Sequence, residues 1–162
     1  MVNHEIKISF QEYTSVDELD QPDKELCFEA VKALKTSHSP YSKFRVSVAM
    51  RLQSGKILHA SNQENVAYPS GLCAERVALF YWGANHPDDP IEGIAVTAHT
   101  DEFKLTKPVT SCGACLQVLA EYEKKQNRAI KMLLYCQGGA VWSATGIESF
   151  LPFLFFEDRL NS

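Results

Sequence analysis

Apolar residues recur along the first part of the chain with two different periods, which predict a helix followed by a β-hairpin. Between residues 22 and 38 the apolar positions follow helical spacing, and they begin at a proline suited to a first helical turn. Ser39-Pro40 ends this pattern. Residues 44–52 instead alternate apolar and polar positions, and a turn containing glycine leads into a second apolar run at 57–60. This part therefore predicts two antiparallel strands.

The remainder of the chain predicts alternating helices and strands that end in a strand pair. Residues 73–82 contain few helix breakers and residues 113–125 are again helical, whereas residues 91–98 are rich in β-branched side chains. Residues 131–136 and 140–145 form a last strand pair across two glycines. This order predicts the α/β class, as a three-layer α/β/α sandwich with a five-stranded mixed sheet.

The N-terminal residues predict an addition to that sandwich. Ile6, Ile8 and Phe10 alternate with polar neighbours, a period of two that suggests a short strand. We expect residues 1–21 to be an N-terminal extension and residues 22–162 to form the single domain.

Size and charge narrow the classes of ligand. A chain of 162 residues with 45% apolar composition can bury one core without covalent staples. Its net charge of -4 leaves no basic surplus for a phosphate backbone, which disfavours a nucleic acid polymer and favours a small ligand. The longest uncharged stretch, residues 132–147, is interrupted by polar residues and glycines, so we expect no membrane segment. Residues 1–12 lack the apolar run of a signal peptide, and an odd number of cysteines predicts reduced thiols in the cytoplasm.

Three cysteines have the placement of zinc ligands. Cys112 and Cys115 form a C-x-x-C pair at the start of one predicted helix, and Cys73 starts another. Helix N-termini stabilise thiolates, and a catalytic zinc site leaves its fourth position to water. Glu75 follows Cys73 by two residues, close enough to reach that water without being a ligand, which is the position of a general acid/base.

A closed structural zinc site or a redox pair is the alternative interpretation of the C-x-x-C motif. A closed site needs a fourth ligand, which Cys27, Cys136 or one of five scattered histidines would have to supply. No histidine has ligand-like spacing. We expect Cys27 and Cys136 to be buried apolar thiols.

The whole pattern resembles the cytidine deaminase family. Its zinc signature is similar to the C-x-E at Cys73, the 36 intervening residues and the C-x-x-C at Cys112. Residues 39–44 and 62–65, followed by Tyr68, are similar to further family blocks in the same order. The resemblance covers roughly residues 22–160. It implies a hydrolase that uses one Zn²⁺ per chain to convert cytidine and deoxycytidine into uridine and deoxyuridine plus ammonia, as in pyrimidine salvage.

The resemblance also implies roles for individual residues. Asn62 and Glu64 would hold the ribose hydroxyls, and Phe44 would pack against the substrate. The backbone N–H of Ala74 would contact the pyrimidine, and the carbonyl of Thr110 would accept from the leaving amino group. Asn62 and Glu64 favour a nucleoside as the substrate.

Short cytidine deaminases assemble as homotetramers, so the resemblance implies a homotetramer here. Phe155 follows a leucine-proline pair, as does the family residue that lines a neighbouring subunit's pocket. The run of four phenylalanines in residues 150–156 agrees with burial against a partner, although a terminal helix packed on its own sheet is the alternative.

Three positions depart from the family pattern. Ser111 replaces a usual proline, so we expect a less rigid loop before Cys112 and some change in substrate range. Leu116 replaces a usual arginine, which leaves Arg76 to moderate the charge of three thiolates alone. Ser47 replaces a usual glycine, and the sequence offers no explanation for it.

Two other functions stay open at this point. The same metal chemistry could deaminate another small aminopyrimidine, an aminopurine or a nucleoside antibiotic. Alternatively, the chain could be a zinc-stabilised binding module without turnover. A polynucleotide editor is disfavoured, because no basic stripe interleaved with aromatic residues is present.

Overall fold

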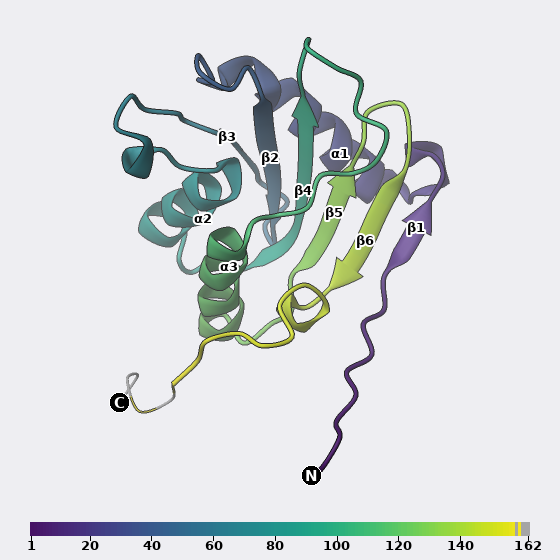
Figure 1. The fold of residues 1–162 in the computed structure, drawn as a ribbon, viewed down its shortest axis with the longest axis vertical. Helices are drawn as coiled ribbons and strands as arrows, with labels where there is room; N and C mark the ends of the chain where they lie inside the picture. The colour runs from purple at the N-terminus through teal and green to yellow at the C-terminus, as the bar shows by residue number, and fades with distance from the viewer. Residues whose placement is uncertain (158, 160–162) are drawn as a thin grey trace.

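A single six-stranded mixed sheet forms the centre of the molecule, with the strand order β1-β6-β5-β4-β2-β3 (Figure 1). The structure is a computed structural model that describes residues 1–157 and 159. β4 and β5 are parallel, and every other neighbouring pair is antiparallel. The strands are β1 (Gln11–Tyr13), β2 (Arg45–Leu52), β3 (Ile57–Ser61), β4 (Ile91–His99), β5 (Lys131–Tyr135) and β6 (Val141–Thr145).

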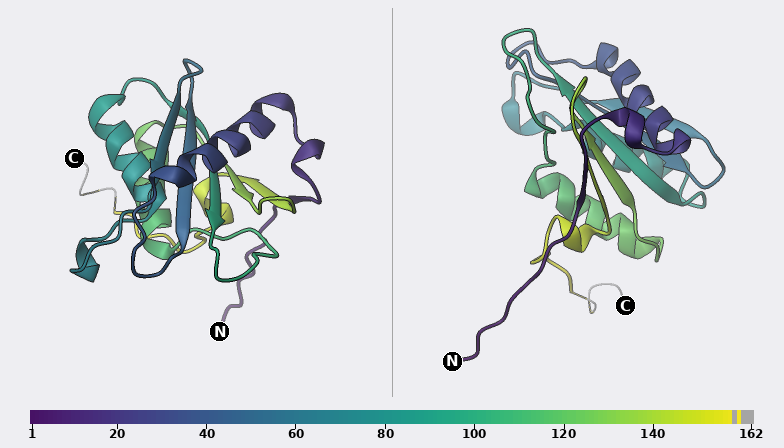
Figure 2. Two further views of the ribbon diagram at one scale, coloured as in Figure 1. Left: turned by 90° about the horizontal axis from the view of Figure 1, so that it is seen from above. Right: turned by 90° about the vertical axis from the view of Figure 1, so that its right-hand side faces the viewer.

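Helices cover both faces of this sheet. α1 lies on one face, and α2 and α3 lie side by side on the other, as two perpendicular views show (Figure 2). The helices are α1 (Gln21–Ala33), α2 (Ala74–Asn85) and α3 (Gly113–Lys125), with single 3-10 turns at Val16–Glu18, Leu34–Thr36, Tyr68–Ser70 and Ile147–Ser149. The predicted three-layer α/β/α sandwich is confirmed. Among the described residues, no helix has the length and apolar character needed to cross a membrane.

The sheet has one strand more than the five that were predicted. The additional strand is β1, whose three residues pair antiparallel with β6. The strand expected at Ile6, Ile8 and Phe10 is wrong, because these side chains are about half exposed and their backbone forms no strand. Apolar alternation predicts a strand where one face is covered, whereas Ile6 and Ile8 stay exposed and Phe10 only contacts the ring of Trp142, with centroids 5.4 Å apart.

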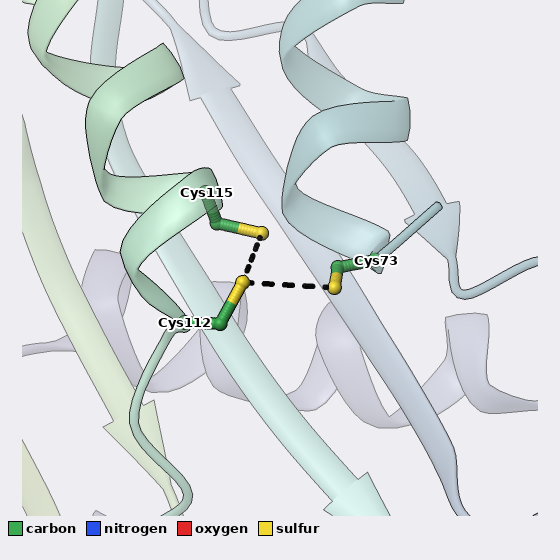
Figure 3. Close-up of side chains that lie close together, drawn as sticks. All are labelled: Cys73, Cys112 and Cys115. Atoms are coloured by element: carbon green, nitrogen blue, oxygen red, sulfur yellow. Dashed lines mark hydrogen bonds between the residues drawn. The ribbon is translucent and has the colours of Figure 1, made fainter. Parts of the chain in front are cut away.

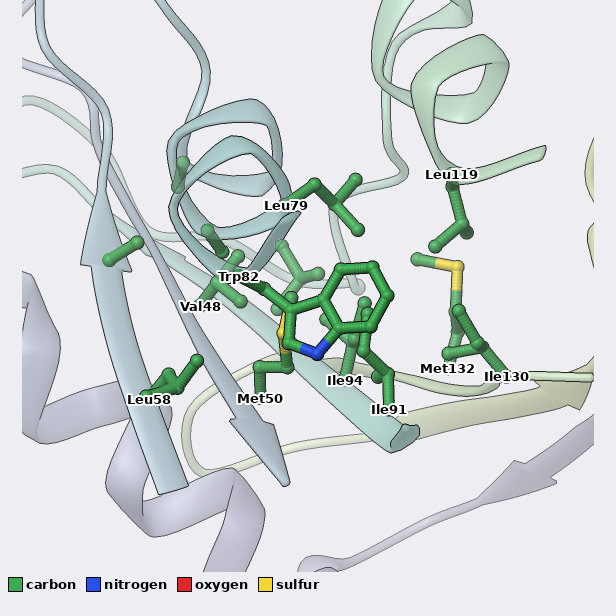
Figure 4. Packing of buried hydrophobic residues seen from close by; sticks show 14 of the residues in the cluster. Val48, Met50, Leu58, Leu79, Trp82, Ile91, Ile94, Leu119, Ile130 and Met132 are labelled. Carbon is green, nitrogen blue, oxygen red and sulfur yellow. The ribbon is translucent and has the colours of Figure 1, made fainter. Parts of the chain in front are cut away.

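The larger core lies between the sheet and the helices α2 and α3 (Figure 4). Trp82 on α2 is fully buried there, and its indole N–H donates to the carbonyl of Asp89 at 2.8 Å, which satisfies the one polar atom of the side chain. Ile91, Ile94 and Met132 belong to the same cluster and come from the sheet. This packing holds α2 against the strands, so the position of the α2 N-terminus is determined by the core.

On the opposite face of the sheet, the contact of Ser47 with α1 explains one departure from the family pattern. Ser47 on β2 is fully buried against α1, and its hydroxyl donates to the carbonyl of Ala30 at 2.6 Å. Glycine at this position could not make that bond. A buried ionic cluster also joins α1 to the sheet, since Asp23 pairs with Arg51 at 3.1 Å and with Lys131. Ser47 thus helps to hold α1 against the sheet.

Candidate active site

Two helix N-termini meet on one side of the sheet and bring three thiols together (Figure 3). Cys73 is the N-cap of α2 and Cys112 is the N-cap of α3, while Cys115 lies in the first turn of α3. The Sγ atom of Cys112 lies 3.9 Å from that of Cys73 and 3.4 Å from that of Cys115. All three sulfur atoms lie within 4.8 Å of one another. Residues 39 positions apart in sequence are therefore neighbours, as the signature predicted.

This donor set fits a zinc ion. A tetrahedral zinc site with Zn–S bonds of about 2.3 Å places its sulfur atoms roughly 3.8 Å apart, close to the separations observed here. Cys115 is buried, Cys73 is half-buried and Cys112 is exposed, so the cluster is closed toward the core and open on one side. The side chains of Cys73 and Cys112 make no capping hydrogen bond to their own helices. The cluster thus has three available ligands and one open direction.

The charges around the thiols favour deprotonation of Cys73. A hydrogen bond from Cys115, followed by hydrogen bonds from Arg76 and Cys112, lowers the pKa of Cys73 to about 5 although burial opposes this. The Arg76 guanidinium donates to the Cys73 sulfur at 3.9 Å. The pKa of Cys115 is raised, because its thiol is the donor beside the Cys73 thiolate and is itself buried. Arg76 therefore lies beside Cys73, and its role in moderating the charge of the cluster stays a prediction.

Glu75 lies in the first turn of α2, beside Cys73. Its side chain is only 6% exposed, and burial raises the pKa of its carboxyl. The same residue lines the large surface cavity described below. Burial thus favours the protonated form of this carboxyl relative to a free one, and its place in the cavity allows it to exchange a proton with a bound molecule.

A cavity of about 610 Å³ opens directly over the thiol cluster. That volume suits a ligand of nucleoside or drug size. Seven of the predicted site residues line it, namely Asn62, Glu64, Cys73, Glu75, Arg76, Thr110 and Cys112. Ala74 and Cys115 are buried directly behind its wall.

Asn62 and Glu64 fix the loop at one end of the cavity. The amide of Asn62 donates to the carbonyl of Phe44 at 2.9 Å and accepts from the N–H of Val46 at 2.9 Å. The Glu64 carboxylate accepts from the N–H groups of Tyr41 and Ser42 and from the Ser42 hydroxyl. Burial alone would raise the pKa of Glu64, but these hydrogen bonds lower it. Glu64 is therefore a charged acceptor in a fixed orientation.

Two predicted residues lie outside the cavity wall. Phe44 is half-buried and stacks on Phe103, with ring centroids 6.3 Å apart. Phe155 is 71% exposed, and its backbone is held by the side chain of Gln117 on α3. The substrate roles of both residues stay predictions.

Two tyrosines at the cavity had no predicted role. The rings of Tyr41 and Tyr68 meet edge to face, with centroids 5.7 Å apart, and both residues line the cavity. Each lies in or beside a sequence block that carries the family resemblance, so position in those blocks was the available signal. Gln63 and Asn65 also line the cavity and lie in the block 62–65, whereas Val109 lines it without any such signal.

Comparison with known proteins places this site in a family context. A profile described as the cytidine and deoxycytidylate deaminase zinc-binding region matches residues 1–106. A cytidine deaminase of Sporosarcina psychrophila is 39% identical over 138 residues, covering 85% of this chain and 94% of the relative. One from Halalkalibacterium halodurans is 40% identical over 93 residues, covering 57% of this chain and 66% of the relative, so the match spans just under two thirds of that protein.

The fold has counterparts among solved structures. The crystal structure of a cytidine deaminase from Burkholderia pseudomallei is similar with a TM-score of 0.70 and 32% sequence identity, over 81% of this chain and 97% of that chain. The likeness therefore extends over most of this chain and nearly all of the solved one.

Proposed function

The chain belongs to the cytidine and deoxycytidylate deaminase zinc-binding family, and on this premise we propose that it is a hydrolase that deaminates cytidine and deoxycytidine. The products are uridine and deoxyuridine plus ammonia, as pyrimidine salvage requires. The observation that carries this proposal is the placement of Glu75, a buried carboxyl with a raised pKa, in a cavity shared with Cys73 and Cys112.

Cys73, Cys112 and Cys115 are the residues that hold the metal. When bound there, zinc lowers the pKa of water toward about 7 and so supplies a nucleophile at neutral pH. Arg76 offsets part of the negative charge of the three thiolates, which favours their deprotonated state.

Glu75 moves the protons. Its carboxyl takes one proton from the attacking water and delivers it to N3 of the pyrimidine. Once the water oxygen is bonded to C4, the carboxyl takes the second proton from that oxygen and gives it to the amino group, so that the C4–N bond breaks, ammonia leaves and the C4 carbonyl forms. The charge that develops on the ring is thereby neutralised without a free hydroxide or hydronium ion. Burial of Glu75 supports this role, because a carboxyl with a raised pKa is a better proton acceptor than a free carboxylate.

Groups along the cavity wall orient the nucleoside. The lowered pKa of Glu64 keeps it ionised, and Asn62 retains one N–H beyond the bond to Phe44, so the pair can accept from and donate to ribose hydroxyls. The N–H of Ala74 belongs to the first turn of α2, where it has no helical acceptor. It can donate to the pyrimidine, and the Thr110 carbonyl can accept from the amino group.

We also propose a homotetramer in the cytoplasm. Phe153 and Phe155 are 84% and 71% exposed, which is unusual for two phenylalanines so close in sequence and supports their burial against another subunit. Phe155 does not line the cavity of its own chain, so a role for it in substrate binding requires the cavity of a neighbour. Five free thiols suit a reducing compartment.

A product assay across several substrates tests the proposed function. Cytidine, deoxycytidine, cytosine, adenosine and guanine are incubated with the zinc-loaded protein, and ammonia and the deaminated product are quantified. We expect turnover of the first two only. Preference for a free base or a purine would show that the proposed substrate class is wrong. Zinc retention without turnover of any of the five compounds would favour a binding module.

A further inference from the structure

Ser111 carries a buried hydroxyl that lacks a hydrogen-bond partner. It lies in the loop directly before Cys112, and its Oγ atom is inaccessible to solvent without a bond to any described residue. Buried hydroxyl groups without a partner are uncommon in folded proteins, so we expect a hydrogen-bond acceptor close to this hydroxyl. A proline at this position would bring no such group.

A small internal void identifies the acceptor. This void, of about 10 Å³, lies behind the large cavity and is lined by both Ser111 and Glu75. The rest of its wall is apolar apart from one thiol, and consists of Leu79, Ile94, Cys115, Leu116, Leu119 and Met132. A void of this volume is at the lower limit of what a water molecule needs, so the acceptor for Ser111 is to be sought among the protein groups of the wall. The carboxyl of Glu75 is thus the one strong acceptor that the wall presents to Ser111.

Glu75 is the acidic residue among the residues that line this void. Other side chains in the void cannot compete, because all but Cys115 lack polar atoms.

We propose that Ser111 is a positioning residue for Glu75, whose hydroxyl donates to the inner carboxyl oxygen and leaves the outer oxygen directed into the cavity. The inference rests on the proposed function of Glu75. A hydrogen bond at the inner oxygen restricts rotation of the terminal carboxyl group, which is otherwise soft. It thereby keeps the outer oxygen at the reacting atoms, where a small displacement is costly to the rate.

Kinetics of single and double variants test this role. Ser111→Ala should lower kcat about 10-fold with little change in KM and in zinc content, because one hydrogen bond to the catalytic carboxyl is lost. Ser111→Thr, which keeps the hydroxyl, should retain most of kcat. In a Glu75→Ala background, Ser111→Ala should have almost no further effect, since no carboxyl is left to position. Equal losses in both backgrounds would contradict the proposal.

Ser47→Ala is the matched control, since it also removes a buried serine hydroxyl but lies on the other face of the sheet. It should leave kcat unchanged.

Crystal structures of the zinc-loaded wild type and of Ser111→Ala decide the geometry independently of turnover. We expect Ser111 Oγ about 2.7 Å from a Glu75 carboxyl oxygen, and a different carboxyl orientation in the variant. A separation beyond a hydrogen bond in the wild type would overturn the inference. A wild type that has this contact but deaminates no substrate would instead refute the proposed function and leave the contact standing.

Discussion

Gln117 holds the backbone of Phe155 with both ends of its side-chain amide. Its Nε2 donates to the Phe155 carbonyl at 2.8 Å, and its Oε1 accepts from the Phe155 N–H at 3.2 Å. Gln117 follows Cys115 by two residues on α3. The helix that begins at the thiol cluster therefore also fixes the exposed aromatic segment, which couples the position of Phe155 to that of the metal ligands.

Gln117→Ala should raise KM about 3- to 10-fold while kcat and zinc content stay near the wild-type values, because one or two hydrogen bonds that hold Phe155 are lost. Steady-state kinetics and light scattering measure this effect together with the assembly state. Phe155→Ala should raise KM in the same direction. Gln117→Glu is the control with an intermediate effect, since it can accept from the N–H but cannot donate to the carbonyl. Unchanged KM in a monomeric, fully active variant would refute the shared-pocket role.

Cys115→Ala should lose zinc and activity together, whereas Cys136→Ser should keep both. Cys115 belongs to the three-sulfur cluster, while Cys136 is a buried thiol whose pKa is raised by desolvation. Elemental analysis of the purified variants measures the metal, with one zinc per chain expected for the wild type. A chelator should lower the melting temperature of the wild type, because a metal bound only by the folded state stabilises it. Stoichiometric zinc in Cys115→Ala would overturn the ligand set.

Much of the fold follows from the sequence because its elements have strong local signals. α3 spans Gly113–Lys125, the predicted range, since an N-cap cysteine precedes a regular apolar stripe. β4 and the β2–β3 hairpin also lie within about a residue of their predicted ranges, because β-branched runs end at clear turn residues. Cys27 and Cys136 are buried thiols as predicted.

Features that depend on contacts between distant parts of the chain could not be predicted from the sequence. β1 has three residues, two of them charged or amidic, so no apolar pattern indicates its pairing with β6. The role of Ser47 depends on its hydrogen bond to the Ala30 carbonyl. This is a contact between a strand and a helix that sequence spacing cannot indicate. The substrate roles of Phe44 and Phe155, which lie outside the cavity wall, stay predictions.

Ser47→Ala should lower the free energy of unfolding by about 1 kcal/mol, the typical worth of one intramolecular hydrogen bond, with unchanged zinc content. The reason is loss of the 2.6 Å bond to the Ala30 carbonyl, which attaches α1 to β2. Urea denaturation of the zinc-loaded protein measures the change. Ser9→Ala, at an exposed position, is the control and should stay within about 0.5 kcal/mol of the wild type. Equal stability of the two variants would show that the Ser47 bond contributes nothing net.

Ammonia release from cytidine by the wild type and by Glu75→Gln, both with measured zinc content, tests the central claim most directly. Because general acid/base catalysis contributes about 10²- to 10⁴-fold, Glu75→Gln should keep its zinc and its fold and lose at least about 10²-fold in kcat. The buried position of Glu75 in the cavity, beside Cys73, is the reason for this expectation. Turnover near the wild-type rate in a zinc-loaded Glu75→Gln protein would contradict the account.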